Sequence, residues 1–121
     1  EFTLYPLMKI LVAARANEKL AFDGPEVDIR NEDKFSKSAQ RVRALGFDGK
    51  WVLHPDQIEL CNKIFLPSDS EFQRASELIA KYESAKSQRL GAVTDGDLMI
   101  DEASRRHAAK IVARRQAFNS K

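Results

Sequence analysis

The most constraining feature of this sequence is a short apolar run, Lys50–Leu53, that turn-forming residues bound on both sides. Gly46 and Gly49 precede the run, and His54-Pro55 ends it just before a helical pattern begins. A run of this length between turn signals is typical of a buried strand. Parallel α/β sheets place their chemistry at the carboxyl ends of their strands, so the polar residues that follow this run are candidate site residues.

A second apolar run, Leu20–Phe22, ends in the same way, in Asp23-Gly24-Pro25. The helical pattern between the two runs follows Asn31, a preferred N-cap residue, and stops at Gly46, a preferred residue for leaving a helix. Strand, helix and strand in this order predict one parallel βαβ unit.

The rest of the pattern is helical apart from one hairpin. We expect a first helix over residues 4–17, a third helix that Pro67 ends, and a last helix over about 102–118. Ser68 and Glu71 form a capping box that starts a fourth helix, and Asp95-Gly96 predicts a hairpin between residues 92–94 and 98–100. The residues expected to face inward are Leu4, Leu7, Met8, Leu11 and Val12 in the first helix, and Ile58, Cys61, Ile64 and Phe65 in the third.

The composition is that of an ordinary globular domain. The chain has 121 residues, of which 43% are hydrophobic and 31% charged, enough for one domain with a modest core. A formal net charge of +2 is too small to imply a nucleic-acid or membrane partner. The single cysteine, Cys61, excludes an internal disulfide and is expected to be a small core residue. With no targeting or membrane-spanning pattern, these features predict a cytoplasmic protein.

The predicted inventory is incomplete for a folded α/β protein. A parallel sheet is covered by helices on both faces, which two strands alone do not allow. The sequence also begins with Glu1-Phe2, has no initiator methionine, and enters a helical pattern at once. The simplest interpretation is a fragment: the last part of a larger α/β barrel or sheet, followed by a C-terminal extension.

Four polar residues near the strands are open to two readings each. Asp23 either faces the mouth of a sheet or bonds the backbone amides of its own turn. His54 either takes part in chemistry or caps the next helix, which its spacing favours. Gln57, in the first turn of that helix, either donates to a phosphate or a carbonyl group or is one of the exposed polar residues that are common at such positions. Lys50 begins its strand, at the end opposite the usual active face, which favours a structural role.

Asp101 lies between the hairpin and the last helix, where Asp is a preferred N-cap, and from spacing alone that is the favoured reading. The basic residues of the last helix are expected to form a solvated face rather than a phosphate site. They are Arg105, Arg106, Lys110, Arg114 and Arg115.

Five short pieces occur in order along nearly the whole chain: Val12–Ala16, Phe22–Pro25, Gly46–Ile58, Asn62–Ser68 and Met99–Asp101. Together they resemble the C-terminal part of the citrate lyase β-subunit/malyl-CoA lyase family, the HpcH/HpaI aldolases. The resemblance implies an α/β fold in which residues 20–22 and 50–53 are strands seven and eight of a TIM barrel. Residues 1–66 would end the barrel. Residues 67–121 would form an extension of helix, hairpin and helix that covers a neighbouring subunit's active site in a trimer or hexamer.

The family's reaction is a reversible, Mg²⁺-dependent Claisen-type cleavage of a 3-hydroxyacyl-CoA. Malyl-CoA or β-methylmalyl-CoA gives acetyl-CoA or propionyl-CoA and glyoxylate. The resemblance implies that Asp101 is the catalytic acid/base. The residues that it implies for the CoA pocket are Asp23, Gly24, Pro25, His54, Pro55 and Gln57.

The family's Mg²⁺ ligands lie on earlier strands, so this chain is expected to need a companion segment carrying strands one to six and to be inactive alone. The alternatives are a citrate lyase β-subunit, a malyl-CoA thioesterase, and a non-catalytic fragment.

Overall fold

The structure is a computed structural model that describes residues 2–87, 93–95 and 98–119. It divides into two compact units, Glu1–Phe65 and Leu66–Lys121. In the described part of the chain, no helix combines the length and the apolar character that crossing a bilayer requires.

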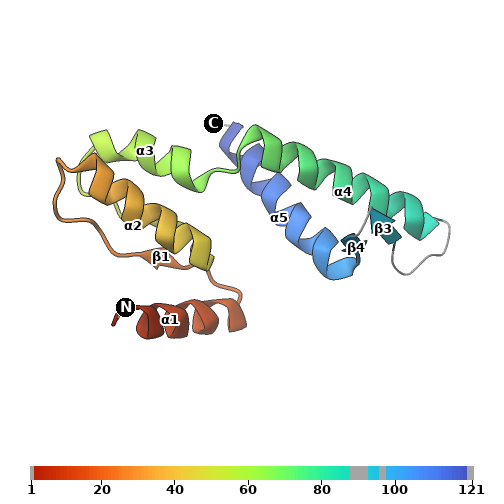
Figure 1. Cartoon of the computed structure of the whole chain (residues 1–121), viewed down its shortest axis with the longest axis horizontal. Coiled ribbons are helices and arrows are strands. Elements are labelled where there is room, and N and C mark those ends of the chain that lie inside the picture. Colours follow the sequence, from red (N-terminus) through yellow and green to blue (C-terminus); the bar gives the residue numbers. More distant parts are fainter. Residues whose placement is uncertain (1, 88–92, 96–97, 120–121) are drawn as a thin grey trace. The chain divides into compact units, whose positions relative to one another are not determined.

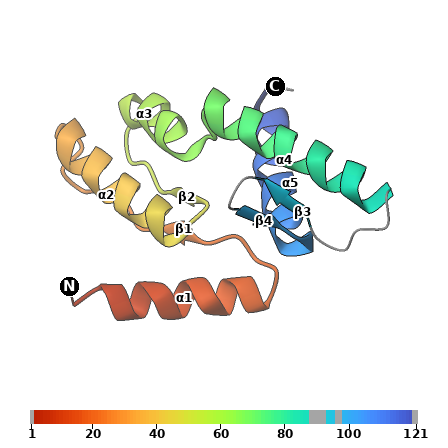
Figure 2. The same ribbon diagram turned by 45° about the vertical axis from the view of Figure 1, so that its right-hand side comes forward.

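The first unit contains the parallel βαβ arrangement that the sequence predicts. Its elements are α1 (Leu4–Ala16), β1 (Phe22–Asp23), α2 (Glu32–Leu45), β2 (Gly49–Lys50) and α3 (Asp56–Phe65). Strands β1 and β2 run parallel, with Phe22 opposite Gly49 and Asp23 opposite Lys50 (Figure 2). The α/β class is therefore confirmed, with a small parallel sheet in a mostly helical chain.

Helix α2 begins and ends where the capping residues predict. The Asn31 side chain accepts a hydrogen bond from the Lys34 amide at 3.0 Å, and Glu32 and Asp33 lie in the first turn, at the positive end of the helix dipole. Gly46 ends the helix with φ of 107°, a left-handed conformation that glycine adopts without steric cost.

The core of the first unit lies between the helices and one face of the two strands. Phe35 and Ala39 of α2 are 1% and 0% exposed. The other buried residues of this core are Leu11, Ala21, Val42, Phe47, Ile64 and Phe65. The inward position of Ile64 and Phe65 is thus confirmed, and Cys61 packs against the core half-buried.

Both strands are shorter than predicted, and the predicted burial of the second is wrong. Strand β2 stops at Lys50, and Trp51 and Leu53 are 66% and 51% exposed. Strand β1 includes Phe22 but not Leu20. Just before β1, the Ala21 amide donates to a side-chain atom, Asp48 Oδ2, at 2.8 Å and not to a backbone carbonyl. The strand therefore begins only at Phe22.

The inward faces of α1 and α3 also differ from the prediction. Leu11 is the buried residue of α1 and Leu7 is half-buried, whereas Met8 and Val12 are 37% and 62% exposed. In α3, Ile58 is 48% exposed. The apolar faces predicted from helical periodicity therefore include residues that the first unit leaves exposed.

Arg15, in the first of the five family-like pieces, ties the end of α1 to the turn before β2. Its guanidinium donates to the Gly46 carbonyl at 2.7 Å and lies 2.8 Å from Asp48 Oδ2. This residue therefore has a structural role in the described fold.

The second unit is a helical pair with a hairpin, as predicted. Its elements are α4 (Asp69–Ser87), β3 (Val93–Asp95), β4 (Leu98–Ile100) and α5 (Glu102–Asn119). Helices α4 and α5 lie alongside each other (Figure 1). The strands pair antiparallel, with Thr94 opposite Met99. Two positions of the predicted hairpin lie outside the described residues: Ala92 of its first strand and Gly96 of its turn.

The capping box at the start of α4 is confirmed. The Ser68 amide donates to Glu71 Oε2 at 2.7 Å, and the Glu71 amide donates to Ser68 Oγ at 3.2 Å. The two helices bury Ala75, Tyr82 and Ala108.

Candidate functional site

The ends of the two parallel strands are joined by a buried ion pair. Lys50 Nζ lies 2.5 Å from Asp23 Oδ2 and donates to the Gly24 carbonyl at 2.7 Å. The Lys50 side chain is 2% exposed and that of Asp23 is 14% exposed. The partner of Asp23 is therefore an ammonium group on the neighbouring strand rather than a backbone amide of its own turn.

The sequence prediction missed this role of Lys50. Because β2 ends at Lys50, this residue stands beside Asp23 at the strand end and not at the opposite end of a longer strand. The Lys50 carbonyl accepts a weak contact from Cys61 Sγ at 3.7 Å, and burial raises the pKa of the Cys61 thiol. Cys61 thus stays protonated, as expected of a core residue.

His54 caps α3, as its spacing favours. Its carbonyl accepts from the Gln57 amide at 3.0 Å, and its Nδ1 accepts from the Asp56 amide at 3.3 Å. The Pro55 carbonyl accepts from the Ile58 amide at 2.9 Å. The first amides of this helix are therefore already bonded within the turn.

Gln57 is the buried polar side chain of this turn, at 4% exposed. Its Oε1 accepts from the Leu53 amide at 2.8 Å and from the His54 amide at 3.4 Å. Its Nε2 is buried without an acceptor among the described residues. The sequence prediction placed Gln57 correctly on the first turn of the helix but did not predict its burial.

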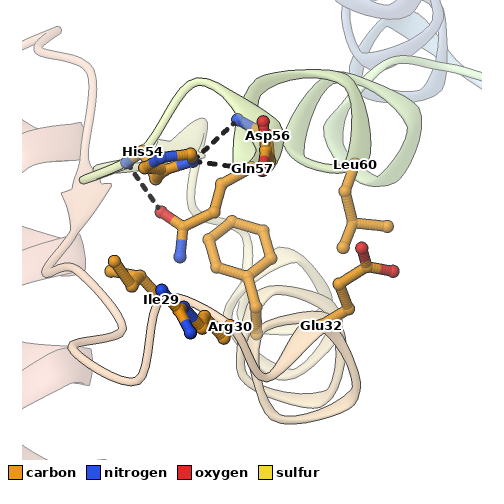
Figure 3. A pocket seen from close by; sticks show the side chains of 8 residues that line it. Ile29, Arg30, Glu32, His54, Asp56, Gln57 and Leu60 are labelled. Atoms are coloured by element: carbon orange, nitrogen blue, oxygen red, sulfur yellow. Dashed lines mark hydrogen bonds and ion pairs between the residues drawn. The ribbon is translucent and has the colours of Figure 1, made fainter.

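His54 and Gln57 line one pocket of about 390 Å³ together with residues from the start of α2 (Figure 3). Arg30 and Glu32 stand opposite them, and Ile29 and Leu60 supply apolar wall. Sequence reasoning missed Arg30 and Glu32, although they flank the N-cap residue that follows the first strand. The pocket does not include Asp23, Gly24, Pro25 or Pro55, so the predicted CoA residues fall into two groups.

Asp101 caps α5 in the second unit. Its Oδ1 accepts from both the amide and the hydroxyl of Ser104, each at 2.8 Å. These hydrogen bonds hold the pKa of the Asp101 carboxyl below its usual range. The capping reading is therefore confirmed.

On α5, Arg105, Arg106 and Arg115 bond acidic or carbonyl groups. Arg105 and Arg106 bond Glu102 at 2.8 and 3.0 Å, and these bonds hold the pKa of Glu102 well below its usual range. Arg115 bonds Asp69 at 2.6 Å and the Pro67 carbonyl at 3.0 Å. The balanced-face reading fits these three arginines better than a phosphate site.

The described residues do not fit a magnesium site. Within them, no three side chains of His, Cys, Asp or Glu gather closely enough to hold a metal ion. The carboxylates of Asp23 and Asp101 are held by Lys50 and Ser104.

Comparison with known proteins finds relatives that are named as lyases. The chain is 39% identical over 112 residues to the L-malyl-CoA/β-methylmalyl-CoA lyase of Rhodobacter capsulatus. This match covers 93% of this chain and 35% of the relative. The chain is 38% identical over 98 residues to the citrate lyase subunit β of Leuconostoc mesenteroides. That match covers 81% of this chain and 32% of the relative. The chain thus spans about a third of the length of these curated relatives.

A solved structure is similar over nearly the whole chain. It is that of CitE from Mycobacterium tuberculosis, in complex with magnesium, acetoacetate and coenzyme A. The match has a TM-score of 0.78 at 28% identity and covers 96% of this chain and 42% of CitE. Residues 2–55 match the HpcH/HpaI aldolase/citrate lyase family, the same family that the whole sequence resembles.

Proposed function

We propose that this chain is the C-terminal part of a CoA-ester lyase. The proposed reaction is the reversible cleavage of malyl-CoA or β-methylmalyl-CoA to acetyl-CoA or propionyl-CoA and glyoxylate. The observation that carries the proposal is the 39% identity to a lyase of this specificity over 112 residues. The parallel βαβ unit supports it, because it is the repeating unit of an α/β barrel.

In this proposal residues 1–66 end the barrel, with β1 and β2 as its seventh and eighth strands. The apolar residues on and after these strands support the placement: Phe22, Trp51 and Leu53 are 53%, 66% and 51% exposed. Exposed apolar groups on and after neighbouring strands mark a surface that another part of a protein covers. The proposed cover is a companion segment carrying strands one to six.

Residues 67–121 are then the extension that reaches a neighbouring subunit's active site in a trimer or hexamer. Asp101 is the proposed acid/base. Cleavage of the C2–C3 bond leaves a thioester enolate that takes up a proton at carbon, and condensation removes that proton. The lowered pKa of Asp101 keeps its carboxylate ionised at neutral pH, which suits the base role.

The CoA pocket is proposed at His54, Pro55 and Gln57, with Asp23, Gly24 and Pro25 beside it. His54 and Gln57 line the 390 Å³ pocket, which is in the size range of ligand sites. Asp23 acts through Lys50, which bonds the Gly24 carbonyl, so we assign it a positioning role.

Magnesium is proposed for the assembled enzyme because CitE binds it. Since the described residues do not fit the ion, its ligands are assigned to the companion segment, and no chemical step of this chain passes through it.

The first test is the intact mass of the purified protein, followed by a cleavage assay. A single 13.7 kDa species is expected to be inactive. Co-expression with the preceding two thirds of the Rhodobacter capsulatus lyase is expected to give a complex that releases glyoxylate from malyl-CoA in the presence of Mg²⁺. A complex of the correct mass without activity contradicts the proposal.

Asp101→Asn separates the two roles of this residue, because Asn caps helices as well as Asp does. We expect the unfolding midpoint to fall only slightly, because the cap stays and only the carboxylate charge is lost. Cleavage should fall by at least about a hundredfold, the usual scale of acid/base catalysis. Asp33→Asn, an exposed change on α2, is the matched control and should keep full activity.

The similarity to a citrate lyase subunit supports a second candidate, cleavage of a citryl thioester. Comparing citryl and malyl thioesters in the same complex decides between them. Release of CoA with malate and without glyoxylate would instead identify a thioesterase.

A further inference from the structure

The orientation of the Gln57 side-chain amide is fixed by its neighbours. Two backbone N–H groups, those of Leu53 and His54, point at one end of the amide. Only the oxygen can accept them, since the NH₂ end would face two donors. The nitrogen must therefore point the other way, and Figure 3 shows it directed towards Ile29 and Arg30, inside the pocket.

This nitrogen is a donor in need of an acceptor. Gln57 is 4% exposed, and Nε2 has no acceptor among the described residues. A buried donor without a partner costs folding free energy. A ligand that brings an acceptor to Gln57 Nε2 would remove that cost, which favours its binding. The start of α3 does not supply competing donors, because its first amides are bonded to His54 and Pro55.

The fixed charges of the pocket select against an anion. Glu32 and Asp56 provide two carboxylates against the one guanidinium of Arg30. Ile29 and Leu60 add apolar wall. The pocket therefore offers the Gln57 Nε2 donor, the carboxylate acceptors of Glu32 and Asp56, and apolar contacts. Such a lining is complementary to an uncharged group that carries both a hydrogen-bond acceptor and a donor.

We propose that this pocket binds an uncharged, acceptor-bearing group of a CoA thioester, which accepts a hydrogen bond from Gln57 Nε2 and donates to Glu32. This inference rests on the proposed function for the identity of the ligand. Two parts of CoA share this chemistry, the adenine ring and the amides of the pantetheine arm. The phosphate groups of CoA lie outside the pocket.

The test is a titration of the ¹⁵N-labelled 121-residue chain, followed through the Gln57 side-chain NH₂ resonances. The probes are adenosine, pantetheine, inorganic phosphate and CoA, each added separately. The critical variant is Gln57→Glu, measured at pH 8. One carboxylate oxygen can still accept from the Leu53 and His54 amides, whose resonances report that the turn is intact, while the donor is lost. Gln40→Glu, an exposed change on α2 with the same charge, is the control.

We expect adenosine or pantetheine to shift the Gln57 NH₂ resonances, and Gln57→Glu to weaken that binding about tenfold, the scale of one lost hydrogen bond. Whichever of the two binds identifies the part of CoA. A phosphate-dependent shift in their place, or no shift with any probe, overturns the inference.

The two proposals fail in different ways. If CoA binds the chain but leaves Gln57 unchanged, the pocket assignment is wrong and the lyase proposal stands. If adenosine or pantetheine binds through Gln57 but the assembled complex cleaves no CoA ester, the pocket assignment stands and the lyase proposal is wrong.

Discussion

At the scale of single residues, the Lys50–Asp23 ion pair links the ends of the two strands. Replacing Lys50 by Met leaves the Asp23 carboxylate without its cation in a site where it is 14% exposed. Breaking a fully buried pair costs about 3–5 kcal/mol, so we expect a loss of about 2–3 kcal/mol for this partly exposed one. Urea unfolding, followed by the fluorescence of Trp51, the single tryptophan of the chain, measures it.

The matched control for that variant is the pair of changes together. Lys50→Met with Asp23→Asn removes both charges and should recover part of the lost stability, because no charge is left buried. A single Lys50→Met variant as stable as the parent chain would show that the pair contributes nothing.

Gly46 is a second residue whose identity the backbone requires. Its φ of 107° is strained for any residue with a Cβ, although the space is open, with Leu11 Cδ2 3.6 Å from an added Cβ. Gly46→Ala should therefore cost about 1–2 kcal/mol through the backbone alone. Gly24→Ala is the control, since an added Cβ there meets nothing within 4 Å. Equal unfolding midpoints for the two variants would argue against the strain.

Residues with local partners were predictable, and those with distant partners were not. Asn31, Ser68 and Asp101 bond amides three residues away, so their roles follow from sequence spacing. Lys50 meets Asp23 across 27 positions, which depends on the register of the parallel strands. No spacing rule supplies that register.

At the scale of elements, the start of α5 should be sensitive to acid. Hydrogen bonds from Ser104 lower the pKa of Asp101 below its ordinary 3.8, and bonds from Arg105 and Arg106 lower that of Glu102 below its ordinary 4.5. A carboxyl group with a depressed folded pKa stabilises the fold fully above its ordinary value. That contribution is lost as the pH falls below it towards the folded pKa.

We therefore expect the Ser104 amide to lose hydrogen-exchange protection as the pH falls below about 4, after correction for the intrinsic exchange rate. Asp101→Asn keeps a cap that does not titrate, so its protection should vary less with pH. The same acid loss in both proteins would show that Asp101 does not control the start of the helix.

The existence and order of the elements were predictable, but the faces that they bury were not. Apolar spacing gave the right helices, yet Val12 and Ile58, expected to face inward, are 62% and 48% exposed. Periodicity reports where apolar side chains lie on a helix and not which of them a given unit covers. Gln57 shows the converse, since its burial depends on the turn that bonds its oxygen.

At the scale of the whole molecule, the strand-end apolar residues should become buried when the proposed companion segment is present. In this chain Trp51 is 66% exposed, and a tryptophan so placed is open to a quencher in solution. Addition or co-expression of a segment carrying strands one to six should shift Trp51 emission to shorter wavelength and reduce its quenching by iodide, because apolar surface on both partners leaves water. A segment from an unrelated barrel, tested in parallel, should do neither.

The emission must change together with the mass of the complex for the barrel placement to hold. A complex of the expected mass in which Trp51 remains as open to iodide as before would mean that the companion binds elsewhere. The lyase proposal would then need a different surface for assembly.

A Trp51→Ala variant tests the same placement through binding energy. In the chain alone, loss of this exposed side chain should change the free energy of unfolding by no more than about 0.5 kcal/mol. In the assembled barrel, its loss should weaken the complex at least tenfold.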